Sequence, residues 1–531
     1  MDRWFLVVAL AALAPNTLAA QAPALSEPVP IIRAVELRRD NIFSPHEATS
    51  FFPRLANSLH LTTRARVVRR ELLFRAGDPY DSARTAETAR TLRRLGVFRS
   101  VRLDTVHSDT GLVMRVLTAD GWSTKPDFRF YSAGRSVVYT LALEESNFLG
   151  TATLVGLRYR HHPDRSTLTA SFRQPRLLAG RVGTYLVYED RSDGSLAYAS
   201  LSRPFFALSE RTAWQADMQT RKETILRFFE GADTAGQILQ RRYFLAYASA
   251  AWALRADSRG YLRAGVFGQV RRDDYADQSR VDTLGHHVTG SAGGFLQIRR
   301  ARFLVSRGLE GIGREQDIDI STVLGVSLSA SPRAFGYDEV GVAPSVSLGT
   351  GFGTNSGFVR LNAIGTGRLT SAGLDSGSVQ LSGTAFLLPG TRHMAVLHAA
   401  AGWQERPAPG AEFDLGLGIG PRGFRQHAFT GDRVFFTTAE YRYTVIEEFL
   451  KNAAIGLAGF VDYGGAWYHG AKRRTGWDAG IGLRIGLTRA IDVEGNRLDL
   501  VYRGKTDVDK GGWTFTVGKG FAFQLTGRLD R

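Results

Sequence analysis

The sequence predicts an all-β transmembrane antiparallel barrel of about 16 strands, preceded by one small α+β domain. Three observations support this prediction: one long apolar run, confined to the N-terminus; alternating hydropathy over most of the chain; and a complete lack of cysteine. A bundle of membrane helices would need an apolar run of about 20 residues for each span, so that class is excluded. Without cysteine no disulfide can stabilise the fold, and packing or a closed hydrogen-bonded sheet must do so.

The N-terminus is typical of an export signal. A short charged start at residues 1–3 precedes an apolar run at residues 4–14, and small residues follow up to Ala22. We interpret residues 1–22 as a signal peptide and the proline-rich residues 23–30 as a linker. A membrane anchor is the alternative, but the apolar run is about half as long as a membrane span requires.

Residues 31–122 are expected to form the α+β domain. Strands are predicted at residues 31–37, 98–105 and 112–118, helices at 64–74 and 82–95, and a less regular insertion at 41–57. Asp81 is placed to cap the second helix. Residues 31–120 hold sixteen arginines, no lysine and ten acidic residues, a net charge of +6. This charge is either a solvated helix surface or a patch for acidic clients.

From residue 125 to 531 the chain alternates between apolar and small or charged residues. In residues 479–487, for example, Ile481 and Leu483 alternate with Gly482 and Arg484. Strands with one lipid face and one wet or filled face have this pattern, and about 25 residues per strand and connection gives about 16 strands. A soluble β-sandwich or propeller is the alternative. Glu315, Asp317 and Asp319 are expected on a lumen-facing strand.

Four local motifs, spread over nearly the whole mature chain, resemble those of the BamA/TamA family of outer-membrane proteins. Residues 67–81 and 92–98 resemble the first helix and the second helix–strand junction of a POTRA domain, a periplasmic module of that family. Residues 420–425, GPRGFR, are similar to the family's long-loop motif, with Pro421 in place of an aliphatic residue. Residues 460–464, FVDYG, match its F-x-D-x-G strand motif. The resemblance implies a barrel of 16 strands with POTRA domains, of which one is visible here.

The two C-terminal motifs predict a contact between a loop and the inner wall. Asp462 lies on the non-lipid face by alternation, and Arg422 lies in a long loop. If the loop folds into the lumen, Arg422 and Asp462 can form a directional ion pair. The candidate lock comprises Arg422, Gly423, Phe424, Phe460, Asp462 and Gly464, and the lumen network is expected to extend to Asp478 and Arg484. The alternative is an exposed Arg422 and an Asp462 that faces lumen water.

A weak closing seam is predicted between the first and last barrel strands, expected near residues 126–131 and at 513–525. The lipid face of the last strand would carry Trp513, Phe515, Val517, Phe521, Phe523 and Leu525. Lys519 would interrupt that apolar face between Gly518 and Gly520. A charge on the lipid face and glycines within a strand both destabilise the strand. Alternatively, Lys519 reaches the membrane interface and the seam stays closed.

Enzyme signatures such as a nucleophile elbow or a P-loop are absent from the sequence, so we expect neither an enzyme nor a cofactor. The pairs His161–His162 and His286–His287 do not favour a metal site, because neighbouring strand residues point to opposite faces. The charge of +16 could suggest nucleic acid, but an exported, strand-rich chain makes that partner unsuitable.

The resemblance implies a location in the outer membrane, with the α+β domain in the periplasm. It implies that the protein helps client proteins to insert or cross there through a laterally opening barrel. The expected partners are membrane lipid, unfolded clients bound by strand addition, and periplasmic proteins or lipoproteins. A passive porin-like channel and a structural surface barrel are the alternatives.

Overall fold

The computed structural model describes residues 29–108, 111–133, 136–177, 181–232, 234–257, 259–277, 287–307, 315–416, 419–449, 453–488, 495–507, 509–521 and 523. The expected signal peptide and residues 23–28 of the expected linker lie outside the described residues. None of the helices in the described part of the chain is long and apolar enough to cross a membrane.

The N-terminal domain is a three-stranded sheet with three helices. Its elements are β1 (Ile32–Asp40), α1 (Phe51–Leu59), α2 (Ala65–Glu71), α3 (Ser82–Arg94), β2 (Phe98–Ser108) and β3 (Gly111–Asp120). β3 lies in the centre of the sheet, parallel to β1 and antiparallel to β2. The predicted order of strands and helices is present, but α1 occupies the segment expected to be irregular.

Local sequence explains the helices of this domain. The Asp81 carboxylate caps α3 as predicted, accepting hydrogen bonds from the backbone N–H groups of Ala83 (2.8 Å) and Arg84 (3.2 Å). Val68 of α2 and Leu92 of α3 are buried in one apolar cluster with Met114 of the sheet. The sequence gives a weak sign of α1, because the helix has only nine residues and contains Pro53, a residue that usually marks a break in a helix.

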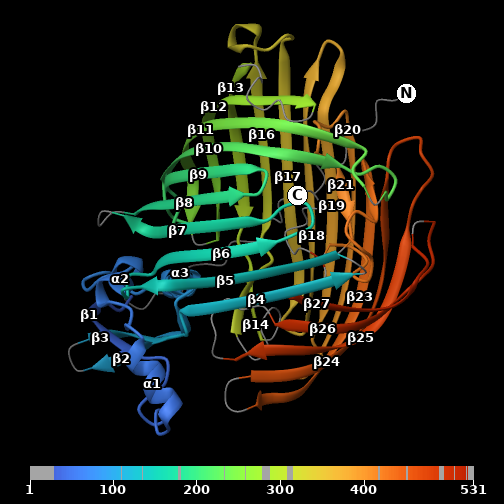
Figure 1. The fold of residues 1–531 in the computed structure, drawn as a ribbon. Helices are drawn as coiled ribbons and strands as arrows, with labels where there is room; N and C mark the ends of the chain where they lie inside the picture. The colour runs from blue at the N-terminus through green and yellow to red at the C-terminus, as the bar shows by residue number, and fades with distance from the viewer. Residues whose placement is uncertain are drawn as a thin grey trace, which may run out of the picture.

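Most of the remaining described chain forms one closed antiparallel barrel of 20 strands. Each barrel strand pairs with the strands that precede and follow it in the barrel, and the last strand closes the barrel against the first (Figure 1). The strands are β4 (Thr124–Ala133), β5 (Ser136–Phe148), β6 (Thr153–His161), β7 (Thr167–Leu177), β8 (Val182–Arg191), β9 (Gly194–Arg203), β10 (Thr212–Arg227), β11 (Gln237–Asp257), β12 (Gly260–Asp277), β13 (Val288–Arg300), β16 (Thr322–Ser331), β17 (Gly341–Thr354), β18 (Gly357–Thr370), β19 (Gly373–Leu387), β20 (His393–Glu405), β23 (Arg433–Phe449), β24 (Ala453–Trp467), β25 (Gly476–Leu487), β26 (Asn496–Arg503) and β27 (Gly512–Lys519).

The predicted number of about 16 strands is wrong because many connections are shorter than we assumed. Arg191 pairs with Gly194, Asp257 with Gly260, and Thr370 with Gly373. Only two residues therefore connect the consecutive strands at each of these turns. Glycine permits the positive φ angles at such turns, for example +103° at Gly373.

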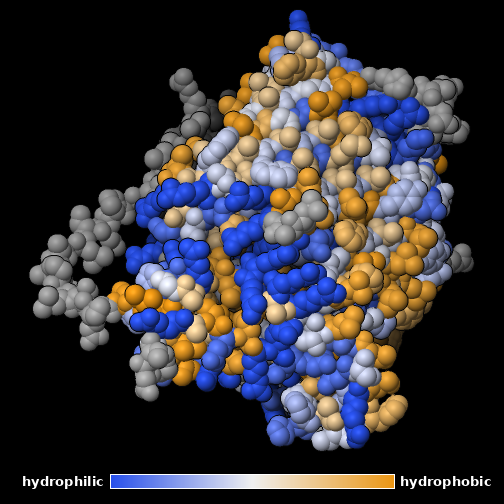
Figure 2. Space-filling model, turned by 90° about the vertical axis from the view of Figure 1, so that its left-hand side faces the viewer, coloured by the Kyte–Doolittle hydropathy of each residue, from blue (hydrophilic) through white to orange (hydrophobic). Residues whose placement is uncertain are grey.

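The two faces of the wall follow the predicted alternation. In β24, Leu457, Val461 and Tyr463 are exposed on the outside, whereas Phe460 and Asp462 are buried inside. On the side of the molecule that carries the N-terminal domain, hydrophilic residues cover the middle of the surface, and hydrophobic residues flank them (Figure 2).

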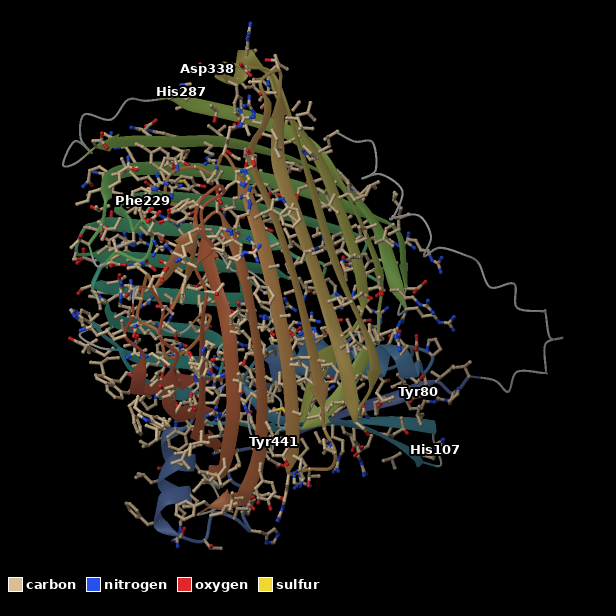
Figure 3. All side chains as sticks on the ribbon, turned by 90° about the vertical axis from the view of Figure 1, so that its right-hand side faces the viewer. Tyr80, His107, Phe229, His287, Asp338 and Tyr441 are labelled. Carbon is tan, nitrogen blue, oxygen red and sulfur yellow. The ribbon has the colours of Figure 1, made fainter. Side chains whose placement is uncertain are left out.

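The N-terminal domain lies against one end of the barrel, opposite the long loops that follow β20 and β24 (Figure 1). His287 and Asp338 accordingly lie at the far end of the barrel from Tyr80 and His107 of the domain (Figure 3). At the near end, the Asn147 side chain donates to the Thr63 hydroxyl (3.0 Å), and the Arg64 backbone N–H donates to the Gly150 carbonyl (2.9 Å).

A hairpin between β13 and β16 adds a second contact with the domain. Its strands β14 (Phe303–Arg307) and β15 (Glu315–Asp319) form a separate two-stranded sheet. Nε of Arg93 in α3 lies 2.6 Å from Oδ2 of Asp317, and Asp319 forms an ion pair with Arg299. The expectation that these acidic residues lie on a lumen-facing wall strand is therefore wrong: they belong to a hairpin outside the barrel sheet.

Candidate functional site in the barrel lumen

The connection between β20 and β23 folds into the barrel. It contains two short paired strands, β21 (Phe413–Leu415) and β22 (Phe429–Gly431), and residues 420–424 and 426–431 are all buried. Burial of a loop is unusual because its backbone polar groups then need partners within the protein. We call residues 406–432 the lumen loop.

Arg422 is the centre of the loop's contact with the wall. Its guanidinium makes a two-pronged contact with Asp462 of β24, with Nε 2.7 Å from Oδ2 and Nη2 3.0 Å from Oδ1. The third nitrogen, Nη1, donates to Glu440 of β23 at 2.9 Å. Both carboxylates and the guanidinium are at most 2% exposed, so their attraction is weakly screened by water.

An aromatic ring also contacts the Arg422 guanidinium. The guanidinium carbon lies 3.6 Å from the ring centroid of Phe460, which is the first residue of the F-x-D-x-G motif. Gly464, the last residue of that motif, faces β23. A Cβ there would lie 2.6 Å from the Phe435 carbonyl oxygen, so glycine lets the two strands approach.

Gly423 and Phe424 of the GPRGFR motif also contact the wall or the loop in ways that depend on their residue type. The Gly423 backbone N–H donates to Asp478 of β25 (2.8 Å), and a Cβ on Gly423 would lie 2.7 Å from Cγ of Arg503. Phe424 is fully buried and packs on Phe429 with ring centroids 5.1 Å apart. The motif therefore fits the wall through a close backbone contact on one side and an apolar contact on the other.

The ion network continues across β23, β25 and β26. Arg484 binds Glu440 (3.1 Å) and Asp499 (2.5 Å), and Asp499 lies 3.5 Å from Arg422. The structure thus brings together Arg422, Asp462, Asp478 and Arg484, as the sequence suggested. Sequence reasoning did not assign Glu440 and Asp499 to the network. Their inner-face positions in the alternation of β23 and β26 were the available signal.

The outer part of the lumen loop is tied to the opposite wall. His427 Nδ1 lies 2.6 Å from Asp414, and its Nε2 lies 3.1 Å from Asp164 in the β6–β7 connection. The Thr430 hydroxyl donates to the Phe228 carbonyl beyond β10 (2.5 Å). The loop therefore bridges the lumen. The His161–His162 pair contributes only His162, 3.6 Å from Asp164, and His286 lies outside the described residues.

An apolar cluster fills the lumen on the side of β18–β24. It joins Phe413, Leu415, Phe424 and Phe429 of the lumen loop to Phe358, Phe386 and Phe436 of the wall, and to Ile318 and Ile320 at the near end. This cluster packs the lumen loop against that side of the wall.

The last strand is shorter than predicted, and its end turns inward. β27 ends at Lys519, and Gly520 has φ +61°. Phe523 stacks on His398 with ring centroids 4.0 Å apart, and Phe521 lies 5.8 Å from Phe386. The prediction that Phe521 and Phe523 lie on a lipid face is therefore wrong, because the glycine lets the chain leave the strand. Leu525 lies outside the described residues.

Lys519 also departs from its expected position. Instead of projecting beside Trp513 and Phe515, its side chain is 13% exposed and pairs with Asp127 of β4, across the junction that closes the barrel. Gly518 accommodates Arg497, whose Nε would lie 2.5 Å from an added Cβ. The Gly520 carbonyl accepts a hydrogen bond from Arg442 (3.2 Å), which itself binds Glu440.

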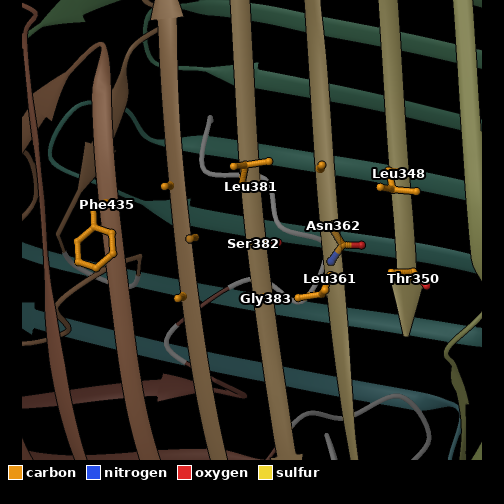
Figure 4. A pocket seen from close by; sticks show the side chains of 12 residues that line it. Leu348, Thr350, Leu361, Asn362, Leu381, Ser382, Gly383 and Phe435 are labelled. Carbon is orange, nitrogen blue, oxygen red and sulfur yellow. The ribbon is translucent and has the colours of Figure 1, made fainter. Parts of the chain in front are cut away.

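The outer wall carries a shallow apolar depression of about 420 Å³ over β17–β20 and β23. Leu348, Leu361 and Leu381 surround it on three neighbouring strands (Figure 4). It holds no charged side chain and belongs to the outer apolar surface rather than to the lumen site.

No family model and no curated protein matches this chain. Among solved structures it is similar to CdiB from Escherichia coli, with 12% identity, 96% of this chain and 94% of that chain covered, and a TM-score of 0.44. CdiB from Acinetobacter baumannii is 10% identical, with 93% of this chain and 74% of that chain covered and a TM-score of 0.44. BamA from Haemophilus ducreyi lacking POTRA domains 1–3 is 12% identical, with 92% of this chain and 85% of that chain covered and a TM-score of 0.37. The function therefore has to be argued from the site itself.

Proposed function

We propose that this protein is an outer-membrane barrel of the BamA/TamA kind that helps client proteins to insert into or cross the membrane. The N-terminal domain would lie in the periplasm and deliver clients to the barrel. The observation that carries the proposal is the contrast within the wall. Buried contacts join β23–β26 to the lumen loop, while the adjacent β27, which has eight residues like β26, closes the barrel against β4 with the Lys519–Asp127 ion pair.

The outer surface of the barrel supports a membrane location. Large apolar side chains that are at least 42% exposed occur on strands all around it, including Leu141, Leu157, Leu296, Leu397 and Leu483. A soluble protein rarely exposes so continuous an apolar surface. A closed barrel with this surface leaves no unpaired strand edge in contact with lipid.

The closing junction supports lateral opening. Lys519–Asp127 is the ion pair that joins the two strands in the described region, and Gly518 and Gly520 flank Lys519. If these strands part, each presents a row of unpaired backbone groups, and an extended client segment can pair with them. The edge strands β1 and β2 of the N-terminal domain offer the same kind of pairing to clients, periplasmic proteins or lipoproteins.

A passive porin-like channel is the main alternative. A porin keeps a polar, water-filled interior. Here a buried loop and an apolar cluster occupy part of the interior, which favours the proposal over a wide polar pore. A structural surface barrel is the second alternative, and it predicts no change in other outer-membrane proteins when the protein is depleted.

Depletion of the protein followed by quantitative outer-membrane proteomics tests this proposal. We expect a defined set of other barrel or exported proteins to fall in the outer membrane, and to return when the wild-type gene is restored. Matched abundance of the client transcripts is the control for changes in expression. If depletion leaves every other outer-membrane protein unchanged, protein insertion is wrong and a structural barrel is favoured.

A further inference from the structure

Helix α1 exposes three large apolar side chains. Phe51, Leu55 and Leu59 follow each other at four-residue spacing on one face and are 78%, 40% and 76% exposed. Leu61, just beyond the helix, is 58% exposed. Single exposed apolar residues are common on proteins, but a helix that turns its whole apolar face outward is not.

The exposure is built into the fold of the domain. The opposite side of α1 is anchored by Ala56, which packs with Ile42 and Phe43. The Asn57 side chain exchanges two hydrogen bonds with the Phe43 backbone, at 2.8 and 3.0 Å. These contacts hold α1 in an orientation that keeps Leu55 and Leu59 away from the domain.

The segment after α1 is fixed equally firmly. The buried Asp120 carboxylate accepts hydrogen bonds from His60 (2.8 Å) and from the backbone N–H (2.7 Å) and hydroxyl (2.9 Å) of Thr63. Asp120 ends β3, immediately before the barrel begins. The apolar face of α1 therefore has a set position relative to the first barrel strands.

This position is beside the apolar rim of the barrel. Arg64 Nε donates to the Leu149 carbonyl (3.0 Å), and a Cβ on Gly150 would lie 3.4 Å from the Leu61 carbonyl oxygen. Phe148 at the end of β5 and Leu149 in the turn that follows are 46% and 50% exposed. The apolar surface of the barrel thus continues through Leu149 to Leu61 and the α1 face.

The charge of the segment matches a negatively charged lipid surface. Residues 51–70 contain five arginines and no acidic residue, and Arg54, Arg64 and Arg66 are exposed. An amphipathic helix with apolar side chains on one face and cations beside them lies in the interface of a membrane that contains anionic lipid.

We propose that α1 and Leu61 form an interfacial anchor that inserts into the phospholipid leaflet around the barrel and holds the N-terminal domain against the membrane. This inference rests on the proposed membrane location of the barrel. It names the lipid surface, rather than a client or a second copy of the chain, as what covers Phe51, Leu55 and Leu59.

The absence of native cysteine permits a direct test with single labels on the full chain. An environment-sensitive fluorophore would be attached at Leu59→Cys, with Arg102→Cys on the exposed side of β2 as the control. Both proteins would be reconstituted at one copy per nanodisc, in phosphatidylcholine with or without phosphatidylglycerol. Quenching by brominated lipid and by aqueous iodide would then be compared.

We expect the label at position 59 to be quenched several-fold more by brominated lipid than the label at position 102, and to be protected from iodide. Phosphatidylglycerol should strengthen this difference, and Phe51→Ser with Leu55→Ser should reduce it. A label at position 59 that is open to iodide, or shielded from both quenchers, would overturn the anchor, the second outcome pointing to a protein cover. Failure of the barrel to reconstitute with heat-dependent gel mobility would instead count against the membrane location.

Discussion

The wall formed by β23–β26 and the junction between β27 and β4 are neighbours in the barrel, yet they are held by different interactions. β23 and β24 have 17 and 15 residues and share a long ladder, and buried ion pairs join both to the lumen loop. β27 has eight residues, like β26, and is hydrogen-bonded to β4, with the Lys519–Asp127 pair across this junction. Charge networks therefore fix the lumen loop to one side of this barrel, whereas a single ion pair joins the adjacent closing strands in the described residues.

Removal of Arg422 should have the largest effect on the locked wall. Arg422→Ala leaves Asp462 and Glu440 buried without their cation, and we expect a loss of about 3–5 kcal/mol in the free energy of unfolding. The readouts are the urea midpoint of the barrel and protease cleavage within the lumen loop. Arg406→Ala is the matched control, since Arg406 lies in the same loop but is exposed. Equal effects of the two substitutions would contradict the lock.

The pair itself can be separated from its surroundings. In a double-mutant cycle with Arg422→Ala and Asp462→Ala, we expect a coupling of about 1–3 kcal/mol, because each substitution removes the same two-pronged contact. Urea unfolding of the wild type, both single variants and the double variant supplies the cycle. Additive losses would show that the two residues stabilise the loop independently.

Close packing of the loop backbone gives a smaller effect. Gly423→Ala places a Cβ 2.7 Å from Arg503 and 2.8 Å from Val501, so we expect a loss of about 1–3 kcal/mol through overpacking. Gly459→Ala in β24 is the control, because an added Cβ there meets nothing within 4 Å. The comparison uses the same urea midpoints, and a Gly423→Ala protein as stable as the control would exclude a tight fit.

The closing junction should respond least in stability. Lys519→Met removes the pair with Asp127, but Asp127 keeps its 2.9 Å contact with Arg129, so we expect a loss of only about 1–2 kcal/mol. The lumen loop should remain resistant to protease in this variant. A cleavable loop would mean that the wall and the junction form one cooperative unit.

Much of the fold follows from periodicity in the sequence. Alternation in residues 453–464 and 479–487 predicted which side chains face the lumen, and it put Asp462 and Arg484 on the correct face. The strand count was wrong because it assumed about 25 residues per strand and connection, whereas several strands are joined by two-residue turns. The Arg422–Asp462 contact was inferred from motif resemblance, since a long loop carries no periodic signal of where it folds.

Other features depend on contacts between distant segments, which no local pattern reveals. The inward turn after Gly520 brings Phe523 to His398, and the β14–β15 hairpin brings Asp317 to Arg93. Phe521 and Phe523 fit the apolar face of a strand as well as they fit a lumen cluster. The α1 helix was missed because a nine-residue segment that contains Pro53 gives a weak helical signal, although Phe51 and Leu59 flank Leu55 at four-residue spacing.

Cross-linking of the closing junction tests lateral opening most directly. Lys519→Cys with Asp127→Cys would be bridged by a short reducible bis-thiosulfonate linker. Ser382→Cys with Ala400→Cys, two opposed residues of β19 and β20, provides the matched lock away from the junction. Client insertion would be assayed before bridging, after bridging and after reduction. We expect the bridged junction to abolish insertion, reduction to restore it, and the β19–β20 lock to have no effect. Full insertion with the junction bridged would contradict lateral opening.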